Sequence, residues 1–272
     1  MFISGQTIQP SFGPDVASDV AGIGDRKRDM YYRKALAWAV AVLIALSSLG
    51  VASAKASSKE NEQRNLQGIE PLNLAVLIQD DLIPQVGNEL GVTRDFIRSL
   101  PEGSRVMVGY ITAGTLQVRQ SFTTDREKAA KSLRIPLASR GSSPFNPYVE
   151  VLEALKKFDT TWTNANAVLL ISDGLDTSRG FDATAAGHTL DIDRTIREAN
   201  KLRVSIFSFY APSVGLTSHS RTAANFGQSS LNRVSNETGG RAFFQGSDSF
   251  VTFDSYFKRL SDTLNRQYAR AR

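Results

Sequence analysis

Three aspartates stand directly after two strongly apolar stretches of the chain. Asp80 and Asp81 follow residues 72–79, and Asp173 follows residues 165–172. Carboxylates gathered in one place can ligate a hard divalent cation such as Mg²⁺, and paired acids also serve in phosphoryl transfer. Either chemistry requires that the fold bring the three side chains together.

The two apolar stretches predict neighbouring central strands of a parallel sheet. Each is an almost continuous run of Val, Ile, Leu and Ala, which is typical of strands that are buried on both faces. Parallel strands end at the same edge of the sheet, and open α/β sheets bind their ligands at that carboxyl edge. We therefore expect Asp80, Asp81 and Asp173 to lie together there.

The rest of the chain alternates between helical and strand patterns. A hairpin is expected where strand 104–112 meets the half-polar strand 116–122 across a short turn. The last helix should carry an apolar stripe formed by Phe250, Phe253, Phe257, Leu260 and Leu264. Further helices are expected at 86–100, 125–133, 148–158, 192–199 and 225–238, and further strands at 203–210 and 241–245. The alternation predicts a doubly wound α/β fold, a mostly parallel central sheet flanked by helices with one antiparallel edge strand.

The N-terminal part of the chain has the three parts of an export signal. Basic residues around Arg33 precede an apolar run over residues 35–46, and Ala52-Ser53-Ala54 then predicts cleavage before Lys55. The alternative is an uncleaved membrane anchor formed by residues 35–54. Both alternatives export the remainder of the chain, to the periplasm, the medium or the outer face of the inner membrane.

The expected organisation of the chain rests on these patterns. Translation is expected to begin at Met30, which would leave residues 1–29 as an untranslated or unstructured extension. The expected segments are an extension at 1–29, a signal peptide or anchor at 30–54, a flexible linker at 55–70, the α/β domain at 71–268 and a basic tail at 269–272.

Composition excludes several classes of function. The chain has 272 residues and a net charge of +5, but its Lys and Arg residues are scattered, with no basic stripe interleaved with aromatic residues, so nucleic acid is not an expected partner. No cysteine is present, which excludes disulfides, Cys-ligated metals and thiol catalysis. Sequence fingerprints of serine hydrolases, zinc proteases, P-loop enzymes and dinucleotide-binding enzymes are also absent.

The order of these elements, together with two short motifs, resembles the von Willebrand factor type A (vWA) domain. The motifs are Ile-Ser-Asp-Gly at 171–174, within VLLISDGLD, and ETGGRAFF at 237–244. More narrowly, the chain resembles the exported "VWFA-related" proteins of acidobacteria, and the resemblance covers residues 71–268.

The resemblance implies a metal-ion-dependent adhesion site at the carboxyl edge. In that family Asp-x-Ser-x-Ser supplies the first ligands, and a Thr and a last Asp come from two later loops. Here Asp80 and Asp173 match the two aspartates, but Leu82 and Pro84 replace the two serines. The implied site is therefore degenerate, with either no cofactor or a weakly bound Mg²⁺ or Mn²⁺. Further candidate oxygen ligands are Asp81, Ser142, Ser143 and Asp176.

An alternative explains the same aspartates without a metal. Asp80 and Asp173 could accept hydrogen bonds from backbone N–H groups and serve only to stabilise turns, as Asp often does after a strand.

The function favoured by these observations is a binding module without catalysis. It would recognise a protein or another envelope macromolecule through loops 81–87, 139–147, 174–188 and 211–224. The candidate contact residues are Asp81, Leu82, Pro84, Ser143, Phe145, Asn146 and Asp176. Two alternatives remain open, a metal-dependent phosphoryl-transfer enzyme and a structural domain with a vestigial site.

Overall fold

The computed structural model describes residues 70–112, 114–138, 146–181, 190–244 and 252–269. The expected extension at 1–29 and signal or anchor at 30–54 lie outside the described residues, as do residues 55–69 of the expected linker. Within the described part, no helix has both the length and the apolar character needed to cross a bilayer.

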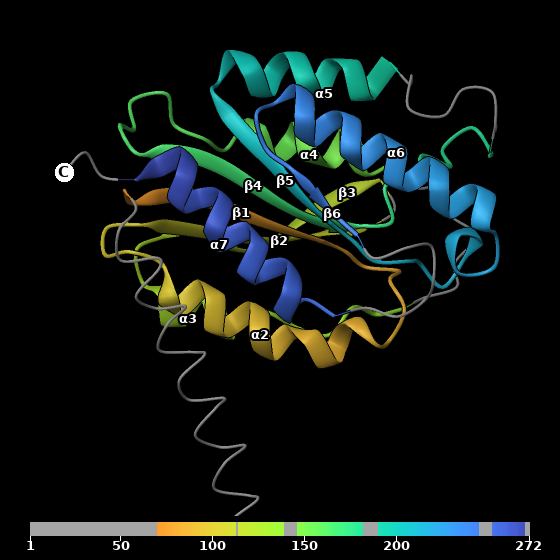
Figure 1. The fold of residues 1–272 in the computed structure, drawn as a ribbon, viewed down its shortest axis with the longest axis horizontal. Coiled ribbons are helices and arrows are strands. Elements are labelled where there is room, and N and C mark those ends of the chain that lie inside the picture. The colour runs from red at the N-terminus through yellow and green to blue at the C-terminus, as the bar shows by residue number, and fades with distance from the viewer. Residues whose placement is uncertain (1–69, 113, 139–145, 182–189, 245–251, 270–272) are drawn as a thin grey trace, which may run out of the picture. The chain divides into compact units, whose positions relative to one another are not determined.

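A six-stranded sheet forms the middle layer (Figure 1). Its strands are β1 (Leu72–Gln79), β2 (Arg105–Thr112), β3 (Thr115–Thr123), β4 (Ala165–Ser172), β5 (Val204–Tyr210) and β6 (Ala242–Phe243). Their order is β3-β2-β1-β4-β5-β6, and every pair is parallel except the β2–β3 hairpin. The prediction of a mostly parallel sheet with one antiparallel edge strand is confirmed.

Helices cover both faces of the sheet (Figure 1). One face packs against α2 (Val86–Ser99), α3 (Arg126–Lys131) and α7 (Asp254–Tyr268). The other face packs against α4 (Pro147–Leu155), α5 (Leu190–Lys201) and α6 (Arg221–Glu237). This arrangement confirms the doubly wound α/β fold. It buries β1 along its whole length and β4 from Ala167 to Ser172, as their apolar runs require.

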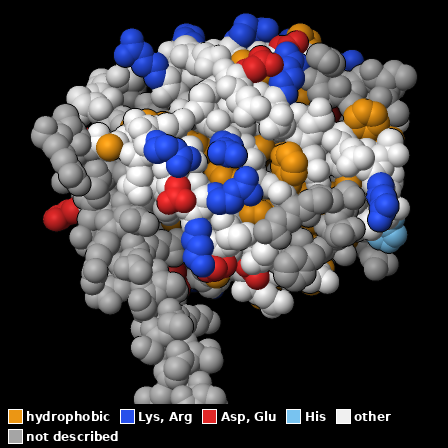
Figure 2. All heavy atoms as spheres, viewed as in Figure 1, with side chains coloured by type: hydrophobic (Ala, Val, Ile, Leu, Met, Phe, Trp, Pro, Cys, Tyr) orange, Lys and Arg blue, Asp and Glu red, His pale blue; other side chains and the backbone are white. Residues whose placement is uncertain are grey.

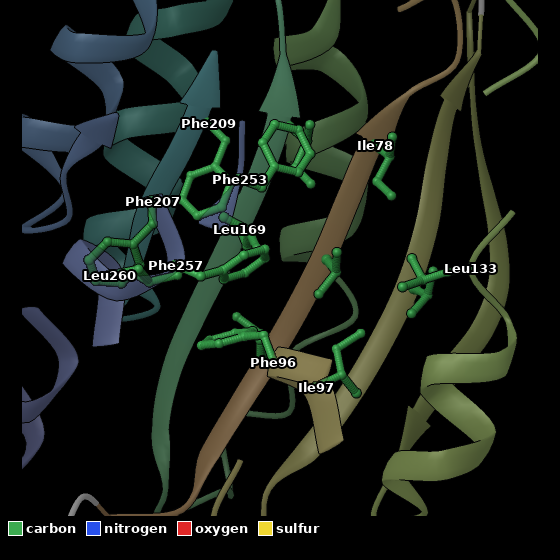
Figure 3. Packing of buried hydrophobic residues seen from close by; sticks show 14 of the residues in the cluster. Ile78, Phe96, Ile97, Leu133, Leu169, Phe207, Phe209, Phe253, Phe257 and Leu260 are labelled. Atoms are coloured by element: carbon green, nitrogen blue, oxygen red, sulfur yellow. The ribbon is translucent and has the colours of Figure 1, made fainter. Parts of the chain in front are cut away.

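Aromatic rings dominate the core beneath α7 (Figure 3). The Phe209 ring on β5 packs edge-on against Phe257 at a centroid distance of 4.8 Å, and it also meets Phe253 and Tyr256. The predicted stripe needs one correction, and one of its members is not described. Phe253 lies just before the helix and not within it, and Phe250 lies outside the described residues. The chain turns into the helix at Phe253, and Tyr256 completes the buried side.

The register of β1 and β4 sets the position of the aspartates. Ile78 lies opposite Ile171, so the two strands reach the carboxyl edge at the same level. Asp80 and Asp173 each lie two residues beyond this pair. The loops that follow the two strands therefore begin side by side.

The two outer strands differ from the four inner ones. Strand β3 has no fully buried residue, and its pairing with β2 contains two register shifts between Val106 and Gly109. At the opposite side, β6 pairs over only two residues, Ala242 and Phe243.

Candidate functional site

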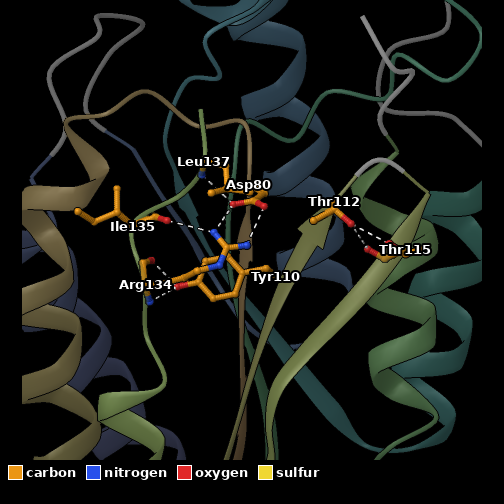
Figure 4. Close-up of polar contacts among 7 residues, drawn as sticks. All are labelled: Asp80, Tyr110, Thr112, Thr115, Arg134, Ile135 and Leu137. Carbon is orange, nitrogen blue, oxygen red and sulfur yellow. Dashed lines mark hydrogen bonds and ion pairs between the residues drawn. The ribbon is translucent and has the colours of Figure 1, made fainter. Parts of the chain in front are cut away.

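Asp80 is held by an arginine from a distant part of the chain (Figure 4). The Arg134 guanidinium donates to both carboxylate oxygens, with Nη1–Oδ1 at 2.6 Å and Nη2–Oδ2 at 2.8 Å. The backbone N–H of Leu137 adds a third bond to Oδ1 at 2.9 Å. Because Asp80 is only 5% exposed, this two-pronged ion pair is largely screened from solvent.

Tyr110 fixes the backbone and the guanidinium of Arg134. Its hydroxyl accepts from the Arg134 N–H at 2.7 Å and donates to the Arg134 carbonyl at 2.5 Å. The guanidinium also lies over the Tyr110 ring, with its carbon 4.0 Å from the centroid. Burial raises the pKa of the Tyr110 hydroxyl, which therefore stays protonated as a donor.

The segment after α3 alternates between inward and outward side chains. Arg134 and Pro136 point inward, whereas Ile135 is 61% exposed and Leu137 is 68% exposed. The backbone N–H of Ala138 donates to the Asp80 carbonyl at 3.0 Å, so the segment is tied to the edge along its length. Two large apolar side chains are therefore presented to solvent on a fixed backbone.

Asp173, at the end of β4, is bound by neutral donors among the described residues. Its Oδ1 accepts from the Leu175 N–H at 3.1 Å and its Oδ2 accepts from the Thr217 hydroxyl at 3.0 Å. The side chain is 3% exposed, and burial raises the pKa of this carboxyl above its ordinary value. The Leu175 bond is the turn-stabilising contact that the metal-free alternative expects of an Asp after a strand.

Asp81 is linked to Asp173 through Gln79. The Gln79 amide donates to Asp81 Oδ1 at 2.7 Å, and its carbonyl oxygen accepts from the Asp173 N–H at 3.2 Å and from the Ser172 hydroxyl at 2.5 Å. Burial, followed by the negative charge of Asp173, raises the pKa of Asp81 to about 7. Asp81 and Asp173 therefore form an acidic pair whose charge is disfavoured, while Asp80 is neutralised by Arg134.

The backbone around Asp173 is fixed by close contact with α6. A Cβ added at Gly227 would lie 1.9 Å from the Asp173 carbonyl oxygen, so only glycine allows this approach. Gly174 has φ +71°, a conformation that favours glycine, and a Cβ added there would also clash with α6, 2.4 Å from the Gly227 carbonyl oxygen. The Tyr148 hydroxyl donates to the Gly174 carbonyl at 2.7 Å from the α4 side.

The other predicted site residues are scattered. Leu82 is fully buried and pairs with Ser213, so its predicted role as a contact residue is wrong. Pro84 is exposed beside α2. Asp176 caps its own turn through Ser178, and Asn146 caps α4 and donates to Asp191. Three candidates lie outside the described residues, Ser142, Ser143 and Phe145.

The described donor set at this edge does not fit a divalent cation. Both oxygens of Asp80 are used by a guanidinium, and Leu82 and Pro84 offer no side-chain oxygen where the resemblance implies two hydroxyls. The Asp173 carboxylate is buried behind the Thr217 hydroxyl. Within the described ranges, no group of three or more His, Cys, Asp or Glu residues could hold a metal ion. The positive charge at Asp80 comes from Arg134.

Four residues that shape the site were missed by the sequence analysis, Arg134, Ile135, Leu137 and Thr217. A single Arg among apolar residues in the stretch Leu-Arg-Ile-Pro-Leu was the available signal, because neither a helix nor a strand pattern explains it. Thr217 gave no comparable signal within its Ser- and Thr-rich loop.

Comparison with known proteins finds no matching family model and no matching curated protein. Among solved structures, the chain is similar to an aerotolerance-related membrane protein from Bacteroides fragilis, with 12% identity and a TM-score of 0.47 over 72% of this chain and all of that one. BatB from Bacteroides thetaiotaomicron gives the same identity and TM-score over 72% and 98% of the two chains. The VWA domain of SpRpn10 gives 12% identity and a TM-score of 0.44 over 73% and 96%. Because all three TM-scores are below 0.5, the fold described above rests on its own strand order and helix placement.

Proposed function

We propose that residues 71–268 form an exported vWA-like binding module without catalysis, and that it contacts a partner protein at the carboxyl edge without a metal ion. The observation that carries the proposal is the exposed pair Ile135 and Leu137, which we call the apolar edge. The proposal includes membership of the VWFA-related family. It also includes the interpretation of Asp80 and Asp173 as remnants of a metal-ion-dependent adhesion site.

The apolar edge has features of a preorganised contact surface. Its backbone is tied down by Tyr110, Asp80 and Arg134 on the inward side, so little conformational freedom would be lost on binding. Ile135 also lies against the first turn of α2, 3.2 Å from the position of a Cβ on Gly87. Large apolar groups held rigidly in solvent are typical of interface anchors.

Both alternatives receive less support. A structural domain with a vestigial site gives no reason to leave Ile135 and Leu137 61% and 68% exposed. A phosphoryl-transfer enzyme would need a carboxylate that is available to attack or to ligate a metal, but both Asp80 oxygens are engaged by Arg134.

Site-specific photo-crosslinking tests the proposal. A photoreactive amino acid at position 135 or 137 of the full-length chain, in cells, is expected to trap the same partner. Val118 on β3, which is 37% exposed, provides the matched control position. Ile135→Asp should abolish crosslinking from position 137, and a chelator should leave it unchanged. Equal trapping from Val118, or loss of the product with chelator, would contradict the proposal.

The export part has its own test. Cell fractionation combined with N-terminal sequencing is expected to find the mature chain outside the cytoplasm and beginning at Lys55. A chain beginning at or before residue 35 in the membrane fraction would instead favour the anchor formed by residues 35–54. A chain recovered only from the cytoplasm would contradict export.

A further inference from the structure

A polar cavity lies beside the outer strand β6, away from the aspartates of the carboxyl edge. Its volume is about 450 Å³, and it is lined by residues from α6, from β6 and its flanks, and from α7. The lining residues used below are Asn232, Asn236, Gly240, Arg241, Phe244 and Arg259.

Two arginines provide the charge of this cavity. The guanidinium carbons of Arg241 and Arg259 lie 5.9 Å and 5.2 Å from the centroid of the Phe243 ring. Stacking on one buried ring restrains both side chains while their N–H donors stay available. Figure 2, in the view of Figure 1, shows several Lys and Arg side chains over α7 with an acidic side chain among them.

No carboxylate balances these two charges within the described part of the chain. The cavity lining contains no Asp or Glu, and no ion pair of Arg241 or Arg259 with a described residue is formed. Arg233, on the same helix as the two asparagines, differs, because it pairs with both Asp193 and Glu237. Among the described residues, the two cavity arginines are therefore left without an acidic partner and can receive an anion.

Neutral donors complete the lining. Asn232 and Asn236 are exposed and lie one turn apart on α6, so their amides occupy the same side of the helix. Gly240, which also lines the cavity, packs directly against the backbone of β5. Only glycine allows this approach, since a Cβ there would lie 2.0 Å from the Ile206 carbonyl oxygen. Guanidinium and amide donors converging from two helices and a strand suit an anion with several oxygens.

We propose that this cavity is a binding site for the dianionic phosphate group of a small phosphomonoester. Two guanidinium charges match a dianion, and their planar forks match the oxygens of a phosphate group. The volume exceeds what a phosphate alone needs and falls within the range of small-molecule sites, so it leaves room for an organic substituent against Phe244. The site is independent of the apolar edge and of its protein partner.

Calorimetric titration of the full-length chain tests this site at constant ionic strength. Inorganic phosphate and phenyl phosphate are the probes, and succinate provides a dianion without phosphate geometry. Phenyl phosphate is expected to bind at least as tightly as phosphate, and succinate is expected to bind more weakly. Arg241→Gln and Arg259→Gln should each weaken phosphate binding by about tenfold or more, since each removes charge-assisted hydrogen bonds.

Lys258→Gln is the matched control, because it removes one positive charge from α7 at the neighbouring exposed position, where Lys258 pairs with Asp254. It should leave the Kd for phosphate unchanged. Thermal melting checks that each variant is folded, and Arg259→Gln decides the question if Arg241→Gln does not fold. Absence of heat up to about 10 mM phosphate, succinate binding as tight as phosphate, or equal weakening by Lys258→Gln would overturn the proposal.

Discussion

Asp80 and Asp173 end two adjacent strands at the same edge, yet their surroundings are opposite. Asp80 forms a two-pronged ion pair with Arg134, at 2.6 Å and 2.8 Å. Asp173 instead receives a backbone N–H and the Thr217 hydroxyl, which are both neutral donors, and its pKa is raised by burial. The comparison shows that the strand determines where an acid lies, while residues distant in sequence determine its charge.

The difference also divides the edge into two parts with different roles. The Asp80 part is neutralised, rigid and bordered by exposed apolar side chains, which favours contact with another protein. The Asp173 part is buried under η1 (Leu216–Ser218) and the middle of α6, where an uncompensated charge is costly. Substitutions on the two sides should therefore differ in size and in pH dependence.

Removal of Arg134 should produce the largest effect. Arg134→Met leaves the Asp80 carboxylate buried without its cation, which should lower the free energy of unfolding by about 3–5 kcal/mol. Urea unfolding at pH 7 measures the change. The double variant Asp80→Asn/Arg134→Met should recover part of the loss, because no buried charge is then left unpaired. A cost below about 1 kcal/mol for Arg134→Met alone would show that Asp80 does not depend on its cation, and would contradict the prediction.

Thr217→Val should have the next largest effect, now on the Asp173 side. It removes the hydroxyl that donates to Asp173 and accepts from the Ser213 N–H, at a cost of about 1–3 kcal/mol. The cost should be greater at a pH above the titration of Asp173 than at one below it, because the donor matters most when Asp173 is charged and burial raises the pKa of this carboxyl. Urea unfolding at two such pH values measures it, and a cost independent of pH would show that Asp173 stays in one protonation state.

Asp81→Asn should stabilise the protein, but only at high pH. The folded pKa of Asp81 is raised to about 7 from 3.8, so the folded state retains this proton longer than the unfolded state does. The resulting penalty is absent below about pH 4, builds up between pH 4 and pH 7, and is complete above pH 7, where both states are ionised. At pH 8 the variant should gain roughly 1–2 kcal/mol, allowing for solvent screening, and at pH 4 it should match the parent chain.

Thermal melting at the two pH values measures the gain from Asp81→Asn. Glu153→Gln removes the same charge at a side chain that is 49% exposed and should show no such pH-dependent gain. If both variants respond alike, a net-charge effect explains the result and the environment of Asp81 does not.

The smallest effect is expected at an exposed ion pair. Arg98 and Glu127 are in contact at 2.6 Å, but their side chains are 40% and 48% exposed. Arg98→Gln should therefore have a much smaller effect on urea unfolding than Arg134→Met, and added salt should reduce it further. A cost similar to that of Arg134→Met would mean that burial does not separate the two pairs.

The sheet and its carboxyl edge could be predicted from sequence because both depend on local patterns. Continuous apolar runs identify buried strands, and strand direction then places Asp80 and Asp173. Arg134 could not be predicted as a partner, since it lies 54 residues from Asp80 and its contact depends on how α3 packs. The predicted roles of Ser142, Ser143 and Phe145 stay predictions.

Leu82 illustrates a different limit of sequence analysis. The resemblance places it on an exposed ligand loop, whereas its apolar side chain is fully buried and joins the core beneath the edge. An apolar residue in place of a polar ligand changes where the backbone can run, because burial of a leucine is worth about 2 kcal/mol. Comparison of motifs alone does not include that contribution.

The margins of the sheet limit how this protein can associate with others. A further strand would need a regular, unpaired backbone edge, but β3 is interrupted by two register shifts and β6 offers only two paired residues. Templated stacking of copies through either margin is therefore disfavoured, which lowers the risk of fibrillar aggregation. Assembly should instead depend on side-chain complementarity, so that single substitutions can switch it off.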